Sequence, residues 1–470
     1  MESYITEYLE LPKTINLPLE TEINPELIKK LVKLSEKNIE RYKVLQEYYE
    51  GKAKINNRSK DEYKANNKLS LDYPSYIVDI LLGMFVGKPV NYTVAEENRE
   101  IMAAIQDVFD VNDEQDENTE IAKMAGIKGR AYEIVYLDEE GQIKFNEIEP
   151  ENIVMIYDNR IKPEPLYCLY VRDDVSVDNL DSDKKDKLIT VYSRDFIRDY
   201  LSKGGDVSLV DEQANLFGEI PVIEFLNNDE GIGDFERVLS LIDAINLSQS
   251  DTANDFQEFT DALLVLSGMP QTDAEDVDNM INDRVILLDK ADGQAAQWLI
   301  KNINDTALEN YKNRLDSDIH KFAKVPNMSD ENFAGNVSGE SMKYKLFGTD
   351  QIISQKQRKF KTALQKRIKL ILNILNIKGS SDFDYRDITI SFNDNKPYNE
   401  LDNINTVKTA LDAGLSKTYA YSKLRDIDDV QEEIERQEQE KDAYAESFVN
   451  SLGDEDDELQ RTREEAWPNS

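Results

Sequence analysis

The chain has 470 residues, of which 40% are hydrophobic and 32% are charged, and its formal net charge is -38 at pH 7. This length allows about three ordinary domains and a sizeable core. Because so acidic a surface repels phosphate backbones, general nucleic-acid binding over the surface is excluded, and any such contact must be local. The single cysteine, Cys168, excludes an internal disulfide, so we expect the chain to fold in a reducing cytoplasm.

The first part of the chain is predicted to be mainly helical. Its start, MESYITEYLELP, lacks the basic and apolar blocks of a signal peptide. Asn24 and Pro25 form a helix start signal, and the helical pattern that follows stops at Gly51. Further helical patterns cover Tyr73–Phe85, Glu96–Phe109 and Glu117–Ala125. The longest apolar stretch, Ile77–Gly87, contains Asp79 and is too short to span a bilayer, so we expect a soluble protein with no membrane partner.

A change to alternating apolar and polar residues predicts strands after this helical part. The stretch RAYEIVYLDEEGQIKFNEIEP alternates around Glu139, Glu140 and Gly141, which is typical of a β-hairpin. Other strand candidates are NIVMIYD, PLYCLYVRD, KLITVYS and IPVIEFL, the last of which ends near Leu226. Helices followed by a run of strands predict an α+β region up to this point.

A glycine-rich joint, Gly231–Gly233, leads into a long predicted helix over Asp234–Phe259. The first half of this helix has apolar residues at helical spacing: Phe235, Val238, Leu239, Ile242 and Ile245. Beyond Leu247 the pattern is polar almost all round. A continuous helix of this length would extend roughly 39 Å at about 1.5 Å per residue. The polar half indicates a helix that has left the core of its own domain, and an ordinary solvent-exposed helix fits the residues equally well.

A compact β-containing insert is predicted at Thr260–Asn304. Its strand candidates are ALLVLSG, RVILLD and AAQWLIKN, placed around the short helical stretch AEDVDNMI. A second helix follows, with Asp305 as its expected cap, and ends at Pro326. Two helices that flank an insert of this size suggest an antiparallel pair that carries a small domain at its far end.

The stretch NFAGNVSGESMKYKLFG, from Asn332 to Gly348, changes from small polar residues to a helical pattern. We expect a helix from Glu340 to about Ile377. Between Gln351 and Ser381 the chain has no acidic residue, although its net charge is -38. The basic residues there are Lys356, Arg358, Lys359, Lys361, Lys366, Arg367, Lys369 and Lys378. Segregation of cations in so acidic a chain requires a reason.

The last part of the chain is predicted to hold a strand and then helices. The strand candidate is DITISFND, and the helical stretch is GLSKTYAYSKLRDIDDVQEEIERQEQEKDAYAE. The final stretch, GDEDDELQRTREEAWPNS, is acidic and has little apolar content. We therefore expect a solvated acidic tail.

Four stretches carry a family resemblance: NKLSLDYPSYIVDILLGMFVGKPVNY, VPNMSDENFAGNVSGESMKYKL, ITISFNDNKPYNE and AGLSKTYAYSKLRDIDDVQEEIERQEQE. In their order and spacing, over nearly all of the chain, they resemble the portal proteins of tailed double-stranded-DNA bacteriophages, in the branch found among siphophages of Gram-positive bacteria. None of the four is a catalytic signature. The chain departs from the family pattern after Ser338 and Gly339, where Glu340 and Ser341 replace a small apolar residue.

The resemblance implies an α+β, mainly helical portal fold with wing, stem, clip and crown, assembled as a cyclic ring. Laid on this chain, it assigns 1–233 to the N-terminal region and wing, 234–259 to the first stem helix, 260–304 to the clip, 305–326 to the second stem helix, 327–339 to the tunnel loop, 340–398 to the long helix and strand of the wing, 399–450 to the crown helices and 451–470 to the acidic tail.

The resemblance also implies the partners. Family members form a ring, twelvefold in the virion, at one capsid vertex, and double-stranded DNA enters and leaves through its centre. Such a homo-oligomer is expected to assemble in the host cytoplasm with scaffolding and major capsid proteins. It then docks the terminase large subunit, and later binds head-completion or adaptor proteins. The motor's ATPase is expected on a separate terminase subunit.

Two sets of residues are implied as sites. The tunnel-loop residues are Asn327, Ser329, Asn332, Asn336, Ser338 and Gly339. Small and amide side chains make weak, exchangeable contacts with passing DNA, whereas Lys or Arg would pair strongly with phosphates. An ordinary linker between helices is the alternative. We expect a solvated face, or a face that pairs with acidic neighbouring subunits, for the basic residues Lys356, Arg358, Lys359, Lys361, Lys366 and Arg367, with a DNA-facing role as the second interpretation.

The residues give little support to an enzyme. GMFVGK, at Gly83–Lys88, lacks both the P-loop spacing and a Ser or Thr after the lysine. One histidine and one cysteine leave few nucleophile–base pairs, and DAEDVDNMINDR lacks the central glycine of a calcium loop. We expect no catalytic residue, no cofactor and no metal, and we interpret the lone His320 as structural. A phage head-associated nuclease or other enzyme is the alternative, and a monomeric cytosolic scaffold is the third hypothesis.

Overall fold

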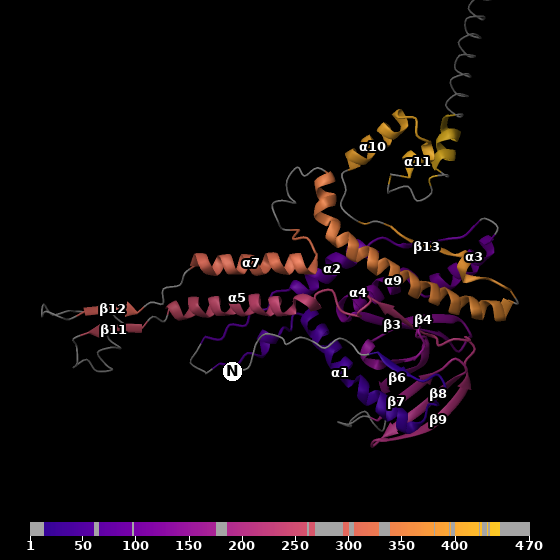
Figure 1. The fold of residues 1–470 in the computed structure, drawn as a ribbon, viewed down its shortest axis with the longest axis horizontal. Helices are drawn as coiled ribbons and strands as arrows, with labels where there is room; N and C mark the ends of the chain where they lie inside the picture. Colours follow the sequence, from indigo (N-terminus) through magenta and orange to yellow (C-terminus); the bar gives the residue numbers. More distant parts are fainter. Residues whose placement is uncertain are drawn as a thin grey trace, which may run out of the picture. The chain divides into compact units, whose positions relative to one another are not determined.

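The computed structural model describes residues 14–60, 65–95, 98–174, 186–260, 263–267, 295–299, 305–328, 339–379, 381–393, 395, 400–422, 424, 430 and 433–441. The chain divides into two compact units, Met1–Met328 with Leu346–Phe392, and Ser329–Lys345 with Asn393–Ser470. The first unit combines helices and sheets, as the α+β prediction expects (Figure 1). No helix within the described ranges is long and apolar enough to cross a membrane.

Along the described part of the chain, most helices lie before or after a central run of strands. The helices are α1 (Pro25–Tyr49), α2 (Tyr73–Val86), α3 (Arg99–Val111), α4 (Glu114–Lys128), α5 (Leu239–Thr260), α7 (Asp305–Ala323), α9 (Gly339–Gly379), α10 (Glu400–Asp412) and α11 (Lys417–Tyr421). The strands are β1 (Ile15–Leu17), β2 (Val90–Thr93), β3 (Arg130–Leu137), β4 (Ile143–Ile148), β5 (Ile153–Asp158), β6 (Pro165–Asp173), β7 (Lys187–Tyr192), β8 (Phe196–Lys203), β9 (Asp206–Ala214), β10 (Val222–Leu226), β11 (Leu263–Ser267), β12 (Ala295–Leu299) and β13 (Thr389–Phe392).

The first helix shows how the local sequence sets the boundaries of an element. α1 begins after Asn24, whose side-chain oxygen accepts a hydrogen bond from the Leu27 amide at 3.0 Å, and Pro25 occupies the first turn. The helix ends at Tyr49, just before Gly51, which has a left-handed φ of +75°. Both boundaries confirm the start and stop signals predicted from the sequence.

A six-stranded sheet in the order β1-β5-β6-β7-β8-β9 forms the largest layer of the first unit. Its strand pairs are antiparallel, except that β1 runs parallel to β5. Successive side chains of a strand face opposite sides of the sheet. Ile156 of β5 accordingly packs in a core cluster with Ile28 of α1, whereas its neighbour Met155 belongs to a second cluster. The sheet is therefore covered on both faces.

A three-stranded sheet in the order β10-β3-β4 contributes to the second cluster. Tyr132 of β3 and Val222 of β10 lie there with Met155. On this smaller sheet, the ring of Phe360 from α9 packs against Phe225 of β10, with centroids 4.9 Å apart. The helix α9 and the strand β10 are far apart in the sequence. The last long helix of the first unit therefore completes the core that the earlier strands begin.

The sequence patterns did not predict β1, β2 or the β8–β9 hairpin. β9 lies at the edge of the sheet with nearly all of its side chains exposed, so it shows no apolar alternation. The hairpin turns at Gly204 and Gly205, which have φ values of +57° and +94°, as a two-residue hairpin turn requires. β2 pairs with β13, which is the strand predicted in DITISFND.

The two long helices predicted to flank the insert lie side by side in the first unit (Figure 1). The first consists of a 3-10 turn, Glu236–Val238, continued by α5, and the second is α7, in which Asp305 lies in the first turn. β11 follows α5, β12 precedes α7, and the two strands pair antiparallel. The helix pair with strands at one end is confirmed, while RVILLD and AEDVDNMI lie outside the described residues.

The second unit contains α10, α11 and a helical stretch at residues 433–441. Ser416 caps α11 by accepting a hydrogen bond from the Tyr419 amide at 3.2 Å. The hydroxyl of Tyr421 donates to Gln437 at 3.1 Å and joins α11 to the helical stretch. Residues 442–470, which include the predicted acidic tail, lie outside the described residues.

Candidate functional site

The polar half of α5 binds the backbone of the segment at residues 65–72. Its acceptors, Asn246, Ser250 and Asn254, are spaced by four and lie along one line of the helix. Each side-chain oxygen accepts a hydrogen bond from a backbone amide: Leu71 to Asn246 at 2.9 Å, Leu69 to Ser250 at 2.9 Å and Asn67 to Asn254 at 2.7 Å. Alternate amides of the segment therefore point to the helix, as they would point to a neighbouring strand.

These bonds correct the interpretation that the polar half of the helix has left the core. Asn246 and Ser250 are unexposed and Asn254 is 2% exposed, so the polar line lies inside the first unit. Backbone amides outside helices and sheets still require acceptors where water is partly excluded, and this segment takes them from side chains of α5. An ion pair between Arg58 and Asp251 adds a charged contact beside this line.

Charged side chains fix the base of α5 to the rest of the first unit. Arg41 of α1 pairs with Glu236 in the turn before α5, and both side chains are buried. The same guanidinium donates to the carbonyl oxygens of Lys128 at 3.3 Å and Gly231 at 3.2 Å. Buried arginine with several acceptors holds each partner in one geometry. The start of the helix is therefore joined firmly to α1 and α4.

The glycine-rich joint before α5 is a place of close backbone approach. A Cβ atom on Gly129 would lie 2.2 Å from the carbonyl oxygen of Gly231, and one on Gly233 would lie 2.3 Å from that of Ile127. Gly129 also has a left-handed φ of +86°. Glycine is required here because a side chain has no room, so these glycines fix the joint instead of loosening it.

The helix α9 is attached to the same region by an ion pair. Lys356 Nζ lies 2.6 Å from Asp234 Oδ2, and the two side chains are 5% and 3% exposed. Asp234 in turn accepts a hydrogen bond from Asn227 at 2.9 Å. The joint before α5 is therefore bound from two sides, by Arg41 of α1 and by Lys356 of α9.

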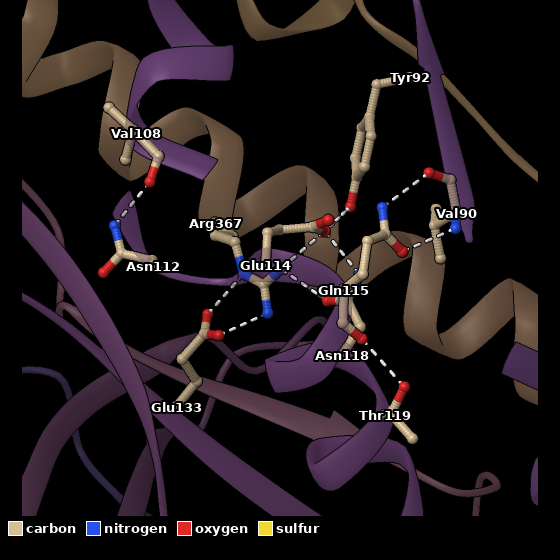
Figure 2. A network of polar contacts seen from close by, with 10 residues as sticks. All are labelled: Val90, Tyr92, Val108, Asn112, Glu114, Gln115, Asn118, Thr119, Glu133 and Arg367. Carbon is tan, nitrogen blue, oxygen red and sulfur yellow. Dashed lines mark hydrogen bonds and ion pairs between the residues drawn. The ribbon is translucent and has the colours of Figure 1, made fainter. Parts of the chain in front are cut away.

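A second cation of α9 enters a buried polar network (Figure 2). Arg367 is unexposed and forms ion pairs with Glu133 of β3 and Glu114 of α4. Its Nη1 also donates to Asn118 of α4 at 2.7 Å, and the hydroxyl of Tyr92 of β2 donates to Glu114. Helices α4 and α9 and strand β3 therefore meet at one guanidinium, and β2 joins the network through Glu114, as Figure 2 shows.

The electrostatics of this network keep its cation charged. Burial raises the pKa of Glu133, and the positive charge of Arg367 opposes that shift. For Arg367, burial lowers the pKa, but Glu133 together with Tyr92 and Glu114 more than offsets this and leaves the pKa above its ordinary value. A charged guanidinium is thus neutralised inside the subunit.

These placements correct the prediction for two of the six basic residues. Lys356 and Arg367 were expected to face acidic neighbouring subunits or DNA, but both are buried and paired within the first unit. The physical reason is that the acidic residues near α9 include buried carboxylates, which require cations from the same chain.

The other four basic residues are half-buried or exposed. Lys359 pairs with Asp229. Lys366 Nζ lies 3.4 Å from the carbonyl oxygen of Val222, and burial lowers the pKa of this lysine. Arg358 is exposed and Lys361 is half-buried. A contact of this helix with a neighbouring subunit or with DNA therefore stays a prediction, and Arg358 and Lys361 are the residues that fit it best.

Only the ends of the predicted tunnel loop are described. Asn327 Nδ2 donates a hydrogen bond to Asp316 Oδ2 of α7 at 3.3 Å, and Gly339 is the first residue of α9. The remaining predicted loop residues, Ser329, Asn332, Asn336 and Ser338, lie outside the described residues. Their contact with DNA stays a prediction.

Sequence reasoning missed the carboxylates that receive the cations of α9. One signal was present, because Glu133 interrupts the run of apolar residues in RAYEIVYL. Glu114 and Asp234 lie in ordinary acidic surroundings and gave no signal. Over the ranges that the structure describes, no group of three or more His, Cys, Asp and Glu side chains is placed to hold a metal ion.

Together these contacts describe a mixed helix and sheet body that holds a pair of long helices by their base. The family model for phage portal proteins of the SPP1 Gp6-like type matches residues 28–447 of the chain. The chain is also similar to the portal protein of Bacillus phage SPP1, with 24% identity over 477 residues, which covers 97% of this chain and 92% of the relative. The chain therefore belongs to the phage portal protein family, whose members are structural components of the virion capsid.

Proposed function

We propose that about twelve copies of this chain close into a ring at one capsid vertex, and that double-stranded DNA passes through its channel during packaging and ejection. The observation that carries the proposal is the α5–α7 pair, which is held at its base by Arg41 and continued by paired strands at one end, in a chain of the portal family. Such a helix pair fits the role of a stem, because copies of the pair arranged around a ring would line a channel.

The segments take their roles from this arrangement. We assign residues 1–233 and 340–398 to the wing region, 234–259 and 305–326 to the stem, 260–304 to the clip, 327–339 to the tunnel loop, 399–450 to the crown and 451–470 to an acidic tail. The net charge of -38 suits a channel wall that must not hold a moving polyanion. The small and amide side chains of the tunnel loop likewise avoid strong contacts with passing DNA.

The proposed partners follow from this role. The ring assembles in the host cytoplasm with scaffolding and major capsid proteins, docks the terminase large subunit, and then binds head-completion or adaptor proteins. The chain itself is not an enzyme in this proposal. In support, Gly83 lies within α2 and Lys88 just after its end, whereas a phosphate-binding P-loop connects a strand to a helix. The ATPase of the motor is then a separate terminase subunit.

The test of DNA passage adds cations to the tunnel loop. Asn332→Lys with Asn336→Lys adds two charges to each subunit, and Gln460→Lys with Asn469→Lys adds the same charge in the tail. Each new phosphate contact in the channel displaces counterions and slows release in a salt-dependent way. We expect the loop variant to form normal rings but to leave less nuclease-protected DNA per capsid, with partial rescue at higher ionic strength. Equal DNA content in the loop and tail variants would exclude this loop from the DNA path.

A further inference from the structure

Two tyrosines at the start of α2 pack against the last turns of α7. The ring of Tyr73 lies 6.0 Å from the His320 ring, and that of Tyr76 lies 5.6 Å from it at 90°. The hydroxyl of Tyr73 donates to Asp316 Oδ1 at 2.6 Å. We call Tyr73, Tyr76, Asp316 and His320 the loop-base cluster. It contains the one histidine of the chain.

The loop-base cluster binds the backbone and side chains that follow α7. The Tyr76 hydroxyl donates to the carbonyl oxygen of Pro326 at 2.9 Å and accepts from the amide of Met328 at 2.8 Å. His320 Nδ1 lies 3.2 Å from the carbonyl oxygen of Val325. Asp316 Oδ2 accepts from the side chain of Asn327 at 3.3 Å. Every residue from 325 to 328 is thus held by a side chain of the cluster, in a stretch with no helix or strand to satisfy it.

The other end of this connection is also held within the first unit. Thr349 of α9 is 2% exposed, and its hydroxyl donates to the carbonyl oxygen of Lys324 at 2.7 Å. Lys324 itself has a left-handed φ of +55°, a conformation in which a helix commonly ends. Leu346, in the turn of α9 before Thr349, is only 3% exposed. Both ends of the connection from α7 to α9 are therefore fixed by described residues.

We propose that the loop-base cluster fixes the point at which the chain leaves α7, and that Tyr76 and Asp316 are positioning residues for the passage of DNA. The second part rests on the proposed function, in which residues 327–339 face the channel. A fixed exit point in every subunit sets where the loop begins relative to α7 and limits the positions that the loop can reach. Four consecutive anchored residues supply that constraint, because the chain emerges from a fixed point after Met328.

At Tyr76, the role of the hydroxyl in fixing residues 325–328 can be tested separately from the packing of the ring. The ring of Tyr76 packs on His320, whereas its hydroxyl alone binds Pro326 and Met328. Tyr76→Phe therefore keeps the packing and removes both backbone contacts. A matched control exists on the neighbouring helix, because the Tyr49 hydroxyl donates to Asp79 of α2 at 3.0 Å and does not contact residues 325–328. Tyr49→Phe therefore removes a tyrosine hydroxyl, as Tyr76→Phe does, but outside the loop-base cluster.

The first experiment measures amide hydrogen exchange in the full chain without DNA. Loss of one ordinary hydrogen bond changes a local opening equilibrium on the order of tenfold. We expect Tyr76→Phe to speed exchange by about this factor at Met328, with α2 and α7 unchanged, and Tyr49→Phe to leave Met328 as it is. Asp316→Asn provides a second variant that keeps the shape of the side chain. Unchanged exchange at Met328 in both cluster variants, or an equal change in Tyr49→Phe, would overturn the anchor.

The second experiment measures nuclease-protected DNA in capsids built with the same variants. We expect normal ring mass in each variant, lower DNA content for Tyr76→Phe, and normal content for Tyr49→Phe. Faster exchange at Met328 with unchanged DNA content would overturn the positioning role. Failure of the proposed function is seen separately, as absence of rings or of DNA in capsids built with the parent chain.

Discussion

Arg367 and Glu133 form a two-point ion pair in which neither side chain is exposed, with Nε of the arginine 2.9 Å from Oε2 of the glutamate. The pair joins α9 to the middle of β3, and Glu114 completes it from α4. This contact holds α9 against the three-stranded sheet β10-β3-β4.

The first prediction is that Arg367→Met destabilises the subunit strongly. The variant leaves two carboxylates buried without their cation, and removal of one partner of a buried pair costs about 3–5 kcal/mol. Arg358→Met, on an exposed position of the same helix, should change the free energy of unfolding by less than about 0.5 kcal/mol. Urea unfolding of both variants measures the difference. Similar urea midpoints for the two variants would show that the buried network does not hold α9.

The second prediction concerns the rigid joint before α5. Gly129→Ala meets both the left-handed φ and the carbonyl oxygen of Gly231, so we expect a loss of about 3–5 kcal/mol. Gly141 has a similar φ of +77° but nothing within 4 Å of an added Cβ, so Gly141→Ala should cost only about 1–2 kcal/mol. The difference between the two variants isolates the steric contact. Equal melting temperatures would mean that the joint can open to admit a side chain.

The third prediction is a pH dependence from Glu117. Burial and the neighbouring carboxyl of Glu147 raise the pKa of Glu117 from 4.5 to about 8. The folded state holds this proton more tightly than the unfolded chain does, so the contribution to stability is full below pH 4.5 and is lost as the pH rises towards 8. Glu117→Gln keeps the uncharged form at every pH. Its melting temperature should therefore rise relative to the parent between pH 5 and pH 8, and the difference should level off above that range.

The control for this titration is Glu139→Gln, at an exposed position in the turn between β3 and β4. We expect its melting temperature to follow that of the parent across the whole pH series. If the difference between Glu117→Gln and the parent stays constant from pH 5 to pH 9, the proton on Glu117 is not linked to folding.

The fourth prediction tests the bond between α5 and the segment at residues 65–72. Ser250→Ala removes the acceptor of the Leu69 amide, which lies 2.9 Å from the serine hydroxyl. We expect hydrogen exchange at Leu69 to become faster on the order of tenfold, while α5 stays protected. Thr252→Val removes a hydroxyl that bonds only within the helix, to Ser248 at 2.7 Å, and should leave Leu69 unchanged. The same exchange rate in both variants would count against this contact.

Local signals predicted much of the fold. The cap at Asn24, the turn at Gly141 and the helical pattern of α9 each depend on neighbours in the sequence, and all three elements are present. The β8–β9 hairpin was missed because β9 is exposed and carries no alternation. The pair Gly204–Gly205 was the one signal that could have found it.

The geometry of the candidate sites could not be predicted, because it depends on contacts between residues that are far apart in the sequence. The cations of α9 were visible as a segregated set, but their direction was not, because Arg367 and Glu133 are separated by 234 positions. The polar line on α5 was interpreted as exposed, since a helix that binds a distant extended segment has the same composition as a solvated one. Hydrogen bonds and ion pairs between residues far apart in the chain were therefore the features that the sequence could not predict.

The proposed closed ring is tested most directly by native mass spectrometry of the full chain. The subunits carry like charges, so assembly should strengthen with salt or divalent cations. Across a salt series we predict a discrete species of about twelve times the 54.0 kDa subunit mass. Only monomers or dimers at every ionic strength would contradict the ring.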